Sequence, residues 1–347
     1  MPDIARRNPL NPLLSPGQVA PSAPGLAVEC LLNPGVFRHN GSLFLLVRVA
    51  ERPSPQPGRV KIPLMENGRL RVLDLDARDP RLDTTDPREF KYDGDGLLST
   101  LSHLRLFRQA ADGSFADTGR RITGDTPDET FGIEDCRVTP LPGGLFALTH
   151  TAVSPRGYGV ALRLTRDWET FANHGLILPP PNKDAALLPE KINNLHHLLH
   201  RPSCVIVGGH DIWHATSPDL LHWGGHTCVA RARKNSWDCA RVGAGAPPVR
   251  TEHGWLLIYH GADRANRYCL GALLLDLKNP ARVIARSADP IMEPLAGYEQ
   301  RGFLGHVVFS NGHDLAPDND TLTLYYGASD TVVCSATFSI REILSRL

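Results

Sequence analysis

Apolar residues gather in short runs along the chain, and Gly and Pro separate these runs. Runs of strand length that are bounded by turn residues are typical of β-strands. Helical periodicity is nearly absent before the C-terminus, where residues 339–347 fit a short helix with Ser339 as its N-cap. The pattern therefore predicts an all-β protein with a short C-terminal helix. Clear examples of predicted strands are 42–49, 145–151, 158–164, 255–260 and 321–326.

A weak internal repeat refines this prediction. Segments 164–175 and 215–226 each contain a strand end, a Ser/Thr-x-Asp turn and then an aromatic residue before another turn. Their separation, about 50 residues, is the size of one blade of a β-propeller. Segment 275–284 fills a similar position without the tryptophan. The repeat favours a β-propeller, with a β-sandwich as the competing architecture.

Two stretches interrupt the strand pattern. Segment 52–58 is rich in proline, and segment 74–95 is polar. We expect both to be surface loops and not domain linkers, so residues 1–347 are predicted to form a single domain.

Composition limits the kind of partner. The 347 residues include 37 basic and 37 acidic side chains, so the formal net charge is zero. This balance indicates neither a nucleic-acid partner nor an anionic membrane, and a neutral ligand fits better. The N-terminus lacks the apolar core of a signal peptide, and no run approaches the roughly 18 apolar residues of a membrane helix. We therefore expect a cytoplasmic protein, with its oligomeric state open and a homo-oligomer included.

Cysteine and histidine spacing gives no sign of a metal site. The seven cysteines contain no Cys-x-x-Cys pair, which argues against a disulfide framework and against structural zinc, so reduced, buried cysteines are expected. No His-x-x-x-His on a plausible helix is joined by a carboxylate at ligand spacing. We expect neither a metal nor a cofactor. The histidines considered were His196, His197, His200, His210 and His214.

Candidate chemistry centres on segment 131–138, where Glu134 and Asp135 stand beside Arg137 at the start of an apolar strand. Cleavage of a glycosidic bond needs a proton donor and a group that directs the nucleophile. Taken singly, such a residue is usually part of a structural ion pair. Similar polar residues recur along the chain in apolar or Gly/Pro surroundings, which favours a pocket. They are Asn33, Arg48, Glu190, Lys191, His200, Arg201, Arg241 and His260.

The ordered set of motifs resembles glycoside hydrolase family 130, whose members are five-bladed β-propellers acting on β-mannosides as phosphorylases or hydrolases. The resemblance covers nearly the whole chain, through segments 32–35, 132–137, 182–192, 200–202, 242–248, 254–261, 270–277 and 307–309. It implies that Asp135 is the catalytic acid. This acid is thought to act through the 3-hydroxyl of the substrate, with inversion at the anomeric carbon.

The same resemblance implies roles for further residues. Asn33, Arg48 and Arg241 match positions that line the mannose site. Lys183, Arg201 and His260 fall near the cationic positions that hold phosphate in the phosphorylases, and His260 is also a candidate sugar contact. If water were the nucleophile, Glu190 and Glu299 are the candidate bases. The remaining substrate-binding candidates are Glu134, Arg137, Lys191, Trp237, Asp263 and Tyr268.

The choice between hydrolysis and phosphorolysis depends on segment 305–312, which reads Gly-His-Val-Val-Phe-Ser-Asn-Gly. Phosphorylases of the family tend to carry Pro-Asn-Val-Val-Phe-Pro-Cys-Gly there. With segments 266–271 and 298–303, this segment is more similar to the β-1,2-mannosidase branch. We therefore predict an inverting β-1,2-mannosidase that acts on short β-mannoside oligosaccharides. The alternatives are a phosphorylase that uses inorganic phosphate as co-substrate and releases mannose 1-phosphate, and a propeller that binds glycans without cleaving them.

Overall fold

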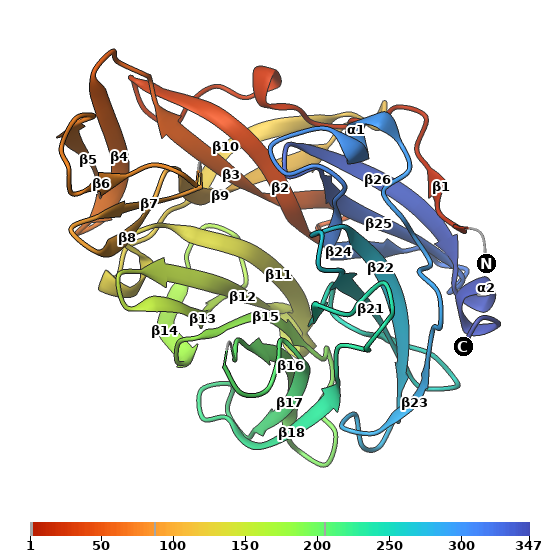
Figure 1. Ribbon diagram of the computed structural model, residues 1–347. Helices are drawn as coiled ribbons and strands as arrows, with labels where there is room; N and C mark the ends of the chain where they lie inside the picture. The colour runs from red at the N-terminus through yellow and green to blue at the C-terminus, as the bar shows by residue number, and fades with distance from the viewer. Residues whose placement is uncertain (1–2, 87, 205) are drawn as a thin grey trace.

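The computed structural model describes residues 3–86, 88–204 and 206–347. It is all-β, as the sequence predicted, and its main body consists of five antiparallel sheets that lie around a common centre (Figure 1). The five predicted strands all lie within observed strands. The first sheet contains β2 (Leu26–His39), β3 (Ser42–Pro53), β9 (Leu101–Gln109) and β10 (Phe115–Ile122).

The next three sheets follow one another along the chain. The second contains β11 (Ile133–Leu141), β12 (Leu145–Ser154), β13 (Gly157–Thr165) and β14 (Ala172–Leu178). The third contains β15 (Asn182–Leu187), β16 (His196–Pro202), β17 (Ile212–Ser217) and β18 (Gly224–Ala230). The fourth contains β19 (Arg241–Ala244), β20 (Val249–Arg250), β21 (Trp255–Ala262), β22 (Tyr268–Leu275) and β23 (Val283–Arg286).

The fifth sheet joins the two ends of the described chain. It contains β24 (Val308–Leu315), β25 (Thr321–Ala328), β26 (Val332–Ser339) and the N-terminal strand β1 (Arg6–Arg7), which pairs with β26. Arg7 also forms an ion pair of 2.8 Å with the buried carboxylate of Glu299. Backbone hydrogen bonds therefore hold the first strand to the last, and the ion pair holds Arg7 to the segment before β24 that carries Glu299.

The apolar core lies between the faces of neighbouring sheets. Alternate residues of a strand point to opposite faces, so Leu322, Leu324 and Tyr326 of β25 share one face, where they pack against Ile258 of β21 and Leu270 of β22. Similar apolar clusters lie between the other sheets. This packing fixes the sheets relative to one another and so fixes the side chains at their inner ends.

The predicted repeat corresponds to the turn between the third and fourth strands of a sheet. In the second sheet, Asp167 accepts hydrogen bonds from the backbone amides of Glu169 and Thr170. In the third sheet, Asp219 accepts the equivalent bonds from the amides of residues 221 and 222. Asp276 does the same in the turn that lacks tryptophan. An Asp side chain that binds amides two and three residues ahead is a common turn device, which explains why the repeat was visible in the sequence.

One structural prediction was wrong. Segment 74–95 is not a surface loop, because it belongs to a folded insertion between β3 and β9 that lies at one side of the main body (Figure 1). Its small apolar core packs on Phe131, next to the predicted catalytic segment. Segment 74–95 contains β6 (Leu82–Asp83), β7 (Glu89–Tyr92) and the start of β8 (Asp95–Leu98), and strands of two to four residues carry little periodic signal, so the sequence pattern did not reveal them. The insertion also contains the longer paired strands β4 (Arg59–Glu66) and β5 (Arg69–Asp76).

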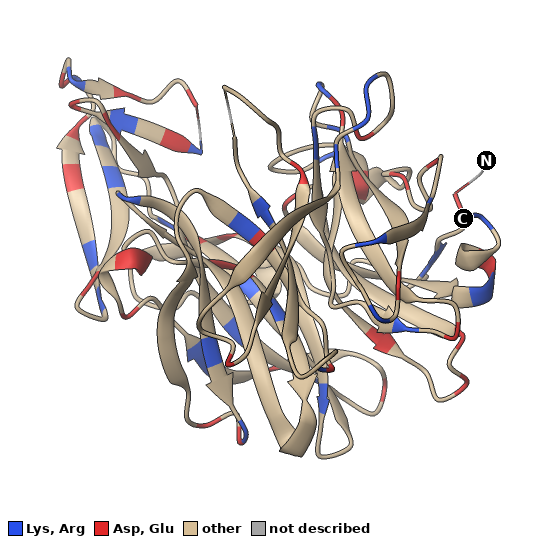
Figure 2. Ribbon diagram, turned by 90° about the horizontal axis from the view of Figure 1, so that it is seen from below, with Lys and Arg blue, Asp and Glu red and all other residues tan. Residues whose placement is uncertain are grey.

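Helices are few and short. The C-terminal helix α2 (Ile340–Leu344) begins after Ser339, whose hydroxyl accepts a hydrogen bond from the backbone amide of Glu342. None of the helices in the described residues is long and apolar enough to cross a membrane. Figure 2 shows Lys and Arg interspersed with Asp and Glu over the ribbon. The remaining helices are α1 (Gly297–Gln300), η1 (Pro16–Gln18), η2 (Pro127–Glu129) and η3 (Pro142–Gly144).

The seven cysteines are free thiols. Cys30, Cys136, Cys269 and Cys334 are buried as expected, whereas Cys204 is exposed and the other two are half-buried. The expectation of buried cysteines therefore holds for four of the seven.

Candidate active site

Three of the main sheets carry the same irregularity in their first strand. The register shifts after Leu32 in β2, after Glu134 in β11 and after Lys183 in β15. A bulge of this kind bends the strand and redirects a side chain. The redirected residues are Asn33, Asp135 and Asp184, with φ of 36°, 48° and 55°. Asn and Asp tolerate this left-handed conformation better than other non-glycine residues, so the residue type follows from the backbone geometry.

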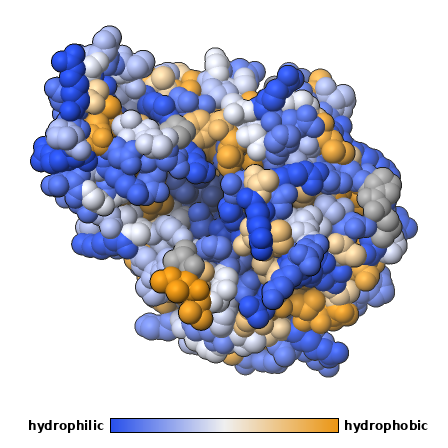
Figure 3. All heavy atoms as spheres, viewed as in Figure 1, coloured by the Kyte–Doolittle hydropathy of each residue, from blue (hydrophilic) through white to orange (hydrophobic). Residues whose placement is uncertain are grey.

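These three side chains line one cavity of about 170 Å³ near the centre of the molecule. Figure 3 shows a hollow in the middle of this face with hydrophilic residues around it. A cavity of this size holds several water molecules, so it has room for a small polar ligand. Its lining residues are Asn33, Arg48, Arg88, Asp135, Lys183, Asp184, Arg201, Tyr268, Leu304, Val307, Phe309 and Asp330.

One side of the cavity holds what we call the acid cluster, formed by Asn33, Arg48, Glu134, Asp135 and Asp330. Oδ1 of Asp135 accepts hydrogen bonds from Nδ2 of Asn33 at 3.0 Å and from the guanidinium of Arg48 at 3.1 Å. The same guanidinium binds Glu134 at 2.6 Å. Asn33 and Asp135 are both buried. The cluster thus contains a carboxyl group in a fixed position, surrounded by groups able to hydrogen-bond a ring of hydroxyls.

Charge decides the protonation of Asp135. Burial alone raises the pKa of Asp135, but attraction to Arg48, Lys183 and Arg137 and the hydrogen bond from Asn33 outweigh burial and hold its pKa below the usual value. The unliganded protein therefore holds Asp135 as a carboxylate at neutral pH. Use of Asp135 as an acid requires a ligand that reduces the surrounding positive charge.

Asp330 is a site residue that the sequence analysis missed. It lies in the turn between β25 and β26, and its φ of 48° again places an Asp in the left-handed region. Burial raises the pKa of Asp330 to about 6, with repulsion from Asp135 and Glu134 acting in the same direction and attraction to Arg48 opposing it. The two cavity carboxyls therefore differ in proton affinity, because the pKa of Asp135 is lowered while that of Asp330 is raised.

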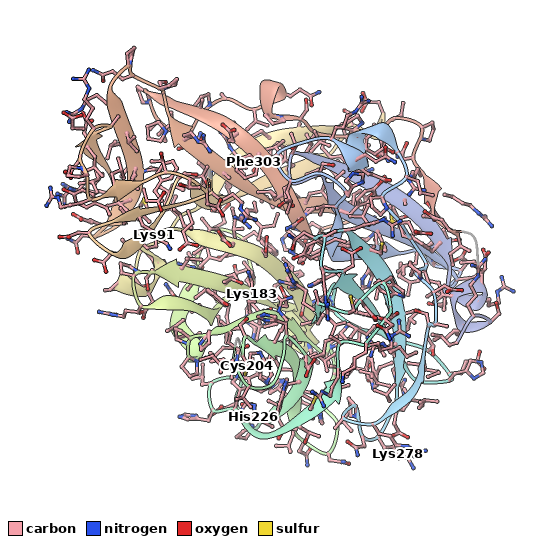
Figure 4. All side chains as sticks on the ribbon, in the orientation of Figure 1. Lys91, Lys183, Cys204, His226, Lys278 and Phe303 are labelled. Atoms are coloured by element: carbon pink, nitrogen blue, oxygen red, sulfur yellow. The ribbon has the colours of Figure 1, made fainter. Side chains whose placement is uncertain are left out.

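A second group of residues at the cavity is the cation cluster, formed by Arg137, Lys183, Asp184, Arg201 and His260. Lys183 of β15 pairs directly with Arg201 of β16 in the register of the two strands. Like charges in directly opposite positions are unfavourable in a sheet. Asp184 offsets part of this repulsion through a contact of 3.1 Å with Arg201. Figure 4 shows Lys183 close to the centre of the molecule.

Asp184 is enclosed by positive or proton-donating groups. Its two carboxylate oxygens lie 3.2 Å from Arg137 and 3.2 Å from Nε2 of His260. Burial opposes ionisation, but Arg201, His260 and Arg137 together hold the pKa of Asp184 well below its usual value. Asp184 is therefore a permanent carboxylate that holds the cation cluster together.

Gly243 makes this arrangement possible. A Cβ atom at Gly243 would lie 2.3 Å from Oδ2 of Asp184 and 2.4 Å from Nε2 of His260. Both groups are buried, so neither has room to move away. The Gly243-Ala-Gly245 segment is thus needed for the close approach of β19 to β15.

Two predicted cavity residues lie behind the lining and not in it. His260 is fully buried, stacks in a tilted geometry on Phe309 with ring centroids 4.1 Å apart, and has its pKa lowered to about 4 by burial despite Asp184. It is therefore a neutral support for Asp184 and not a contact for sugar or phosphate. Arg137 is also buried, and it donates hydrogen bonds to the backbone carbonyls of Ala244 and Gly245.

Tyr268 lines the cavity as predicted, and Arg241 supports it. The guanidinium of Arg241 donates hydrogen bonds of 2.8 Å to the Tyr268 hydroxyl and to Oδ1 of Asn266. Arg241 itself is not part of the lining. The structure therefore places Arg241 next to a lining residue and not in the lining, where it holds the Tyr268 hydroxyl.

Three other candidate binding residues have structural roles elsewhere. The indole of Trp237 donates to the carbonyl of Ala288 and stacks on Tyr259. Asp263 accepts hydrogen bonds from the amides of the following turn, and Lys191 donates to a backbone carbonyl at an exposed position. None of the three lines the described cavity.

Both candidate bases are also outside the cavity. Glu190 is about half exposed, and its ion-pair partner is Arg250 at 3.8 Å. Glu299 is fully buried, where it binds Arg7, the Tyr326 hydroxyl and the amides of residues 295 and 296. A carboxylate with all these donors has no free lone pair for water. The structure therefore does not bring either candidate base to the cavity.

The histidines form pairs within the third sheet. Nδ1 of His197 lies 2.8 Å from Nε2 of His214, and Nε2 of His200 lies 3.1 Å from Nδ1 of His226. Within residues 3–86, 88–204 and 206–347, no group of three or more His, Cys, Asp or Glu side chains has the geometry to hold a metal ion.

Asp184, Asp330 and Arg88 line the cavity, although the sequence analysis did not select them. Asp184 had a recognisable signal, because Lys183-Asp184 interrupts an apolar strand as Glu134-Asp135 does. Asp330 follows a strand end and resembles an ordinary turn residue. Arg88 lies in the polar segment that was taken for a loop, so no local pattern identified it.

Comparison with known proteins agrees with this geometry. A family model for glycoside hydrolase family 130, described as beta-1,4-mannooligosaccharide phosphorylase, matches residues 118–347. A beta-1,2-mannobiose phosphorylase of Listeria innocua is 40% identical over 345 residues, which cover 97% of this chain and 96% of the relative. A 1,2-beta-oligomannan phosphorylase of Thermoanaerobacter sp. is 40% identical over 225 residues, which cover 64% of this chain and 73% of the relative.

Solved structures agree with the sequence comparisons. The Listeria innocua beta-1,2-mannobiose phosphorylase in complex with beta-1,2-mannobiose superposes with a TM-score of 0.94 at 40% identity, over 99% of both chains. A family 130 structure reported with hydrolases that target beta-1,2 mannosidic linkages in Candida mannan superposes with a TM-score of 0.75 at 20% identity, over 98% of this chain and 96% of the other, which supports the fold alone. The resemblance noted in the sequence is thus confirmed, and the chain belongs to glycoside hydrolase family 130.

Proposed function

We propose that this protein is an inverting β-1,2-mannoside phosphorylase that converts β-1,2-mannobiose and inorganic phosphate into α-mannose 1-phosphate and mannose. The observation that carries this proposal is the pairing of Lys183 directly opposite Arg201 at the cavity, beside the acid cluster. Two cations in this position repel each other, and a bound dianion would turn the repulsion into charge-assisted hydrogen bonding. The names of the relatives support the same activity.

This proposal reverses the preference for hydrolysis drawn from the sequence. That preference depended on the residues of segment 305–312, together with segments 266–271 and 298–303. These segments contribute Tyr268, Val307 and Phe309 to the cavity lining and no carboxylate. The two carboxylates nominated to activate water lie outside the cavity. Phosphate therefore becomes the favoured nucleophile.

The proposed reaction uses both clusters. The mannose ring that is transferred binds to Asn33, Arg48 and Asp330. Asp135 gives its proton to the substrate 3-hydroxyl, which passes its own proton to the glycosidic oxygen. The bond from C1 to that oxygen breaks, with its electron pair leaving on the oxygen of the released mannose. A phosphate oxygen held by Lys183 and Arg201 attacks C1 from the opposite face, so the configuration inverts.

Phosphate binding would also prepare the acid. Lys183 helps to keep the pKa of Asp135 low in the unliganded protein. A dianion beside Lys183 and Arg201 cancels their positive charge and adds negative charge near Asp135. Both effects raise the pKa of that carboxyl. The proton needed for catalysis is therefore held most strongly when the nucleophile is present.

The architecture proposed for this activity is a five-bladed β-propeller made of residues 1–347 as a single catalytic domain. The five main sheets would be the blades, with β1 completing the last blade beside β26. The cavity would then lie at the inner ends of the blades, where the bulged first strands meet. This is a usual place for a small-ligand site in folds of this class.

A second candidate, hydrolysis, is favoured by one observation. The pKa of Asp330 is raised to about 6, which suits a general base near neutral pH. Asp330 would then activate water in place of phosphate. The expected products differ, so one assay separates the two activities.

Purified protein is incubated with β-1,2-mannobiose, with and without millimolar phosphate, and the products are identified by NMR. Formation of α-mannose 1-phosphate only when phosphate is present supports phosphorolysis. Free mannose formed at the same rate without phosphate, initially as the α-anomer, establishes hydrolysis and overturns the proposal. Sugar binding without either product would identify a glycan-binding protein.

A further inference from the structure

We propose that Arg88 recognises the leaving-group sugar by donating hydrogen bonds to its hydroxyls, and so selects the acceptor in the reverse reaction. The inference rests on the proposed function and extends it to the outer part of the site. It concerns the folded insertion between β3 and β9, which supplies Arg88 to the cavity lining from the segment between β6 and β7.

Arg88 lies at the mouth of the cavity and not at its base. Its side chain is 55% exposed, whereas Asn33, Asp135 and Asp184 are buried. Arg88 lines the same cavity as Asp330 and Tyr268, and both residues interact electrostatically with its guanidinium. A disaccharide whose transferred ring occupies the buried acid cluster has its other ring toward the mouth, beside Arg88.

The partner of Arg88 indicates which ligand chemistry it suits. The guanidinium binds Asp86 through two atoms, Nε at 3.1 Å and Nη2 at 2.9 Å. This bidentate pair cancels the net charge and fixes the plane of the guanidinium, while Nη1 keeps its N–H donors for other groups. A neutralised donor in a fixed orientation suits a neutral sugar hydroxyl better than a phosphate dianion.

Lys183 provides the contrast within the same cavity. Its Nζ lies 5.1 Å from the ring centroid of Tyr158, and no carboxylate of the described residues lies within ion-pair distance of it. Lys183 therefore keeps its full charge for an anion. The two cationic residues are suited to different ligands, phosphate for Lys183 and sugar hydroxyls for Arg88.

The insertion also provides a matched control. Arg81 binds Asp79 in the same way, through Nε at 3.0 Å and Nη2 at 2.7 Å, and its side chain is 52% exposed. It also contacts the Tyr92 hydroxyl. Arg81 does not line the cavity. Arg81→Ala therefore removes a paired surface arginine from the same insertion, as Arg88→Ala does, but leaves the cavity lining unchanged.

The test is synthesis of β-1,2-mannobiose from α-mannose 1-phosphate and mannose by the wild type, Arg88→Ala and Arg81→Ala. Loss of a hydrogen bond to a sugar hydroxyl predicts that Arg88→Ala raises KM for mannose by up to about tenfold. KM for mannose 1-phosphate should stay within about twofold of the wild type, and Arg81→Ala should match the wild type in both constants. A rise in KM for mannose 1-phosphate equal to that for mannose, or equal behaviour of the two variants, would overturn the assignment.

A binding measurement separates this inference from the proposed function. Each arginine substitution is combined with Asp135→Asn, and the proteins are titrated with β-1,2-mannobiose by calorimetry. Weaker binding in the Arg88→Ala protein alone supports the contact whether the enzyme uses phosphate or water. Equal binding in both proteins refutes it. Failure of the wild type to use mannose 1-phosphate would refute the phosphorylase proposal only.

Discussion

Asp330→Asn should stabilise the protein while it impairs activity, because the ionised carboxylate of Asp330 is electrostatically unfavourable in the folded state. The pKa of Asp330 is raised from an ordinary 3.8 to about 6, mainly by burial and also by repulsion from Asp135 and Glu134. Between these two values the folded state binds the proton more strongly than the unfolded state. The stability associated with the protonated carboxyl is therefore complete below about pH 4 and is lost as the pH rises through about 6.

The size of the effect follows from the shift. A shift of about two pKa units corresponds to at most about 3 kcal/mol at pH 8. Because Asp330 is only partly shielded from water and also attracts Arg48, we expect Asp330→Asn to raise the free energy of unfolding by about 1–2 kcal/mol. Asn also tolerates the left-handed backbone at this position, so the substitution adds no strain.

Urea denaturation at pH 8 and at pH 4 measures the effect, and kcat/KM for phosphorolysis gives the functional cost. The gain in stability should be present at pH 8 and should shrink toward pH 4. Asp320→Asn is a control of opposite sign in the same sheet, because hydrogen bonds from Arg341 and Ser339 lower the pKa of Asp320 to about 2. Its loss of stability should be present at pH 8 and should fade as the pH falls below about 4. A gain for Asp330→Asn that is absent at pH 8 or equal at both pH values would refute the reasoning.

Three further predictions concern the other parts of the site. Asp135→Asn should lower kcat at least a hundredfold, while the calorimetric Kd for β-1,2-mannobiose stays within about tenfold; near-normal turnover would exclude Asp135 as the acid. Gly243→Ala should raise KM for phosphate and lower the free energy of unfolding by about 1–3 kcal/mol, because the new methyl group overlaps the buried cation cluster. The control is Gly17→Ala, where no atom lies within 4 Å of the added carbon. This control should change neither KM for phosphate nor the free energy of unfolding. Glu299→Gln should lower thermal stability because it breaks a buried ion pair, whereas Glu190→Gln should leave thermal stability unchanged. Both variants should keep the wild-type kcat at low temperature. Loss of kcat in either variant would restore that residue as a candidate base.

The parts of the fold that were predictable are those set by local residue patterns. Strand β21 is a run of apolar residues between turns, and the repeated turns at Asp167 and Asp219 depend on side chain to backbone bonds only two or three residues long. Strand β1 contains only two residues, Arg6 and Arg7, and depends on β26 at the other end of the chain. Its pairing is a property of the complete fold and leaves no local pattern.

The difference between local patterns and contacts set by the complete fold also explains the site predictions. Asp135 was identified through a motif, and the left-handed bulge confirms that its position is unusual in the backbone. His260 and Glu299 have polar side chains suited to a site, but packing between neighbouring sheets buries both completely. Whether a strand residue faces the cavity or the layer behind it depends on the position of the next sheet. That information is absent from a single strand's sequence.

The three bulged residues show how the same backbone conformation can present side chains with different chemistry. Asn33, Asp135 and Asp184 have the same left-handed conformation on three neighbouring first strands, so the backbone alone assigns them no separate roles. Their partners distinguish them. Asp184 has contacts with two arginines and a histidine, which hold its pKa well below the usual value, so it cannot retain a proton for delivery. Asp135 shares its nearest cation, Arg48, with Glu134, and its pKa is lowered less strongly. In the proposed reaction, a bound dianion would therefore restore the proton more readily on Asp135 than on Asp184, which supports the proposal that Asp135 is the acid.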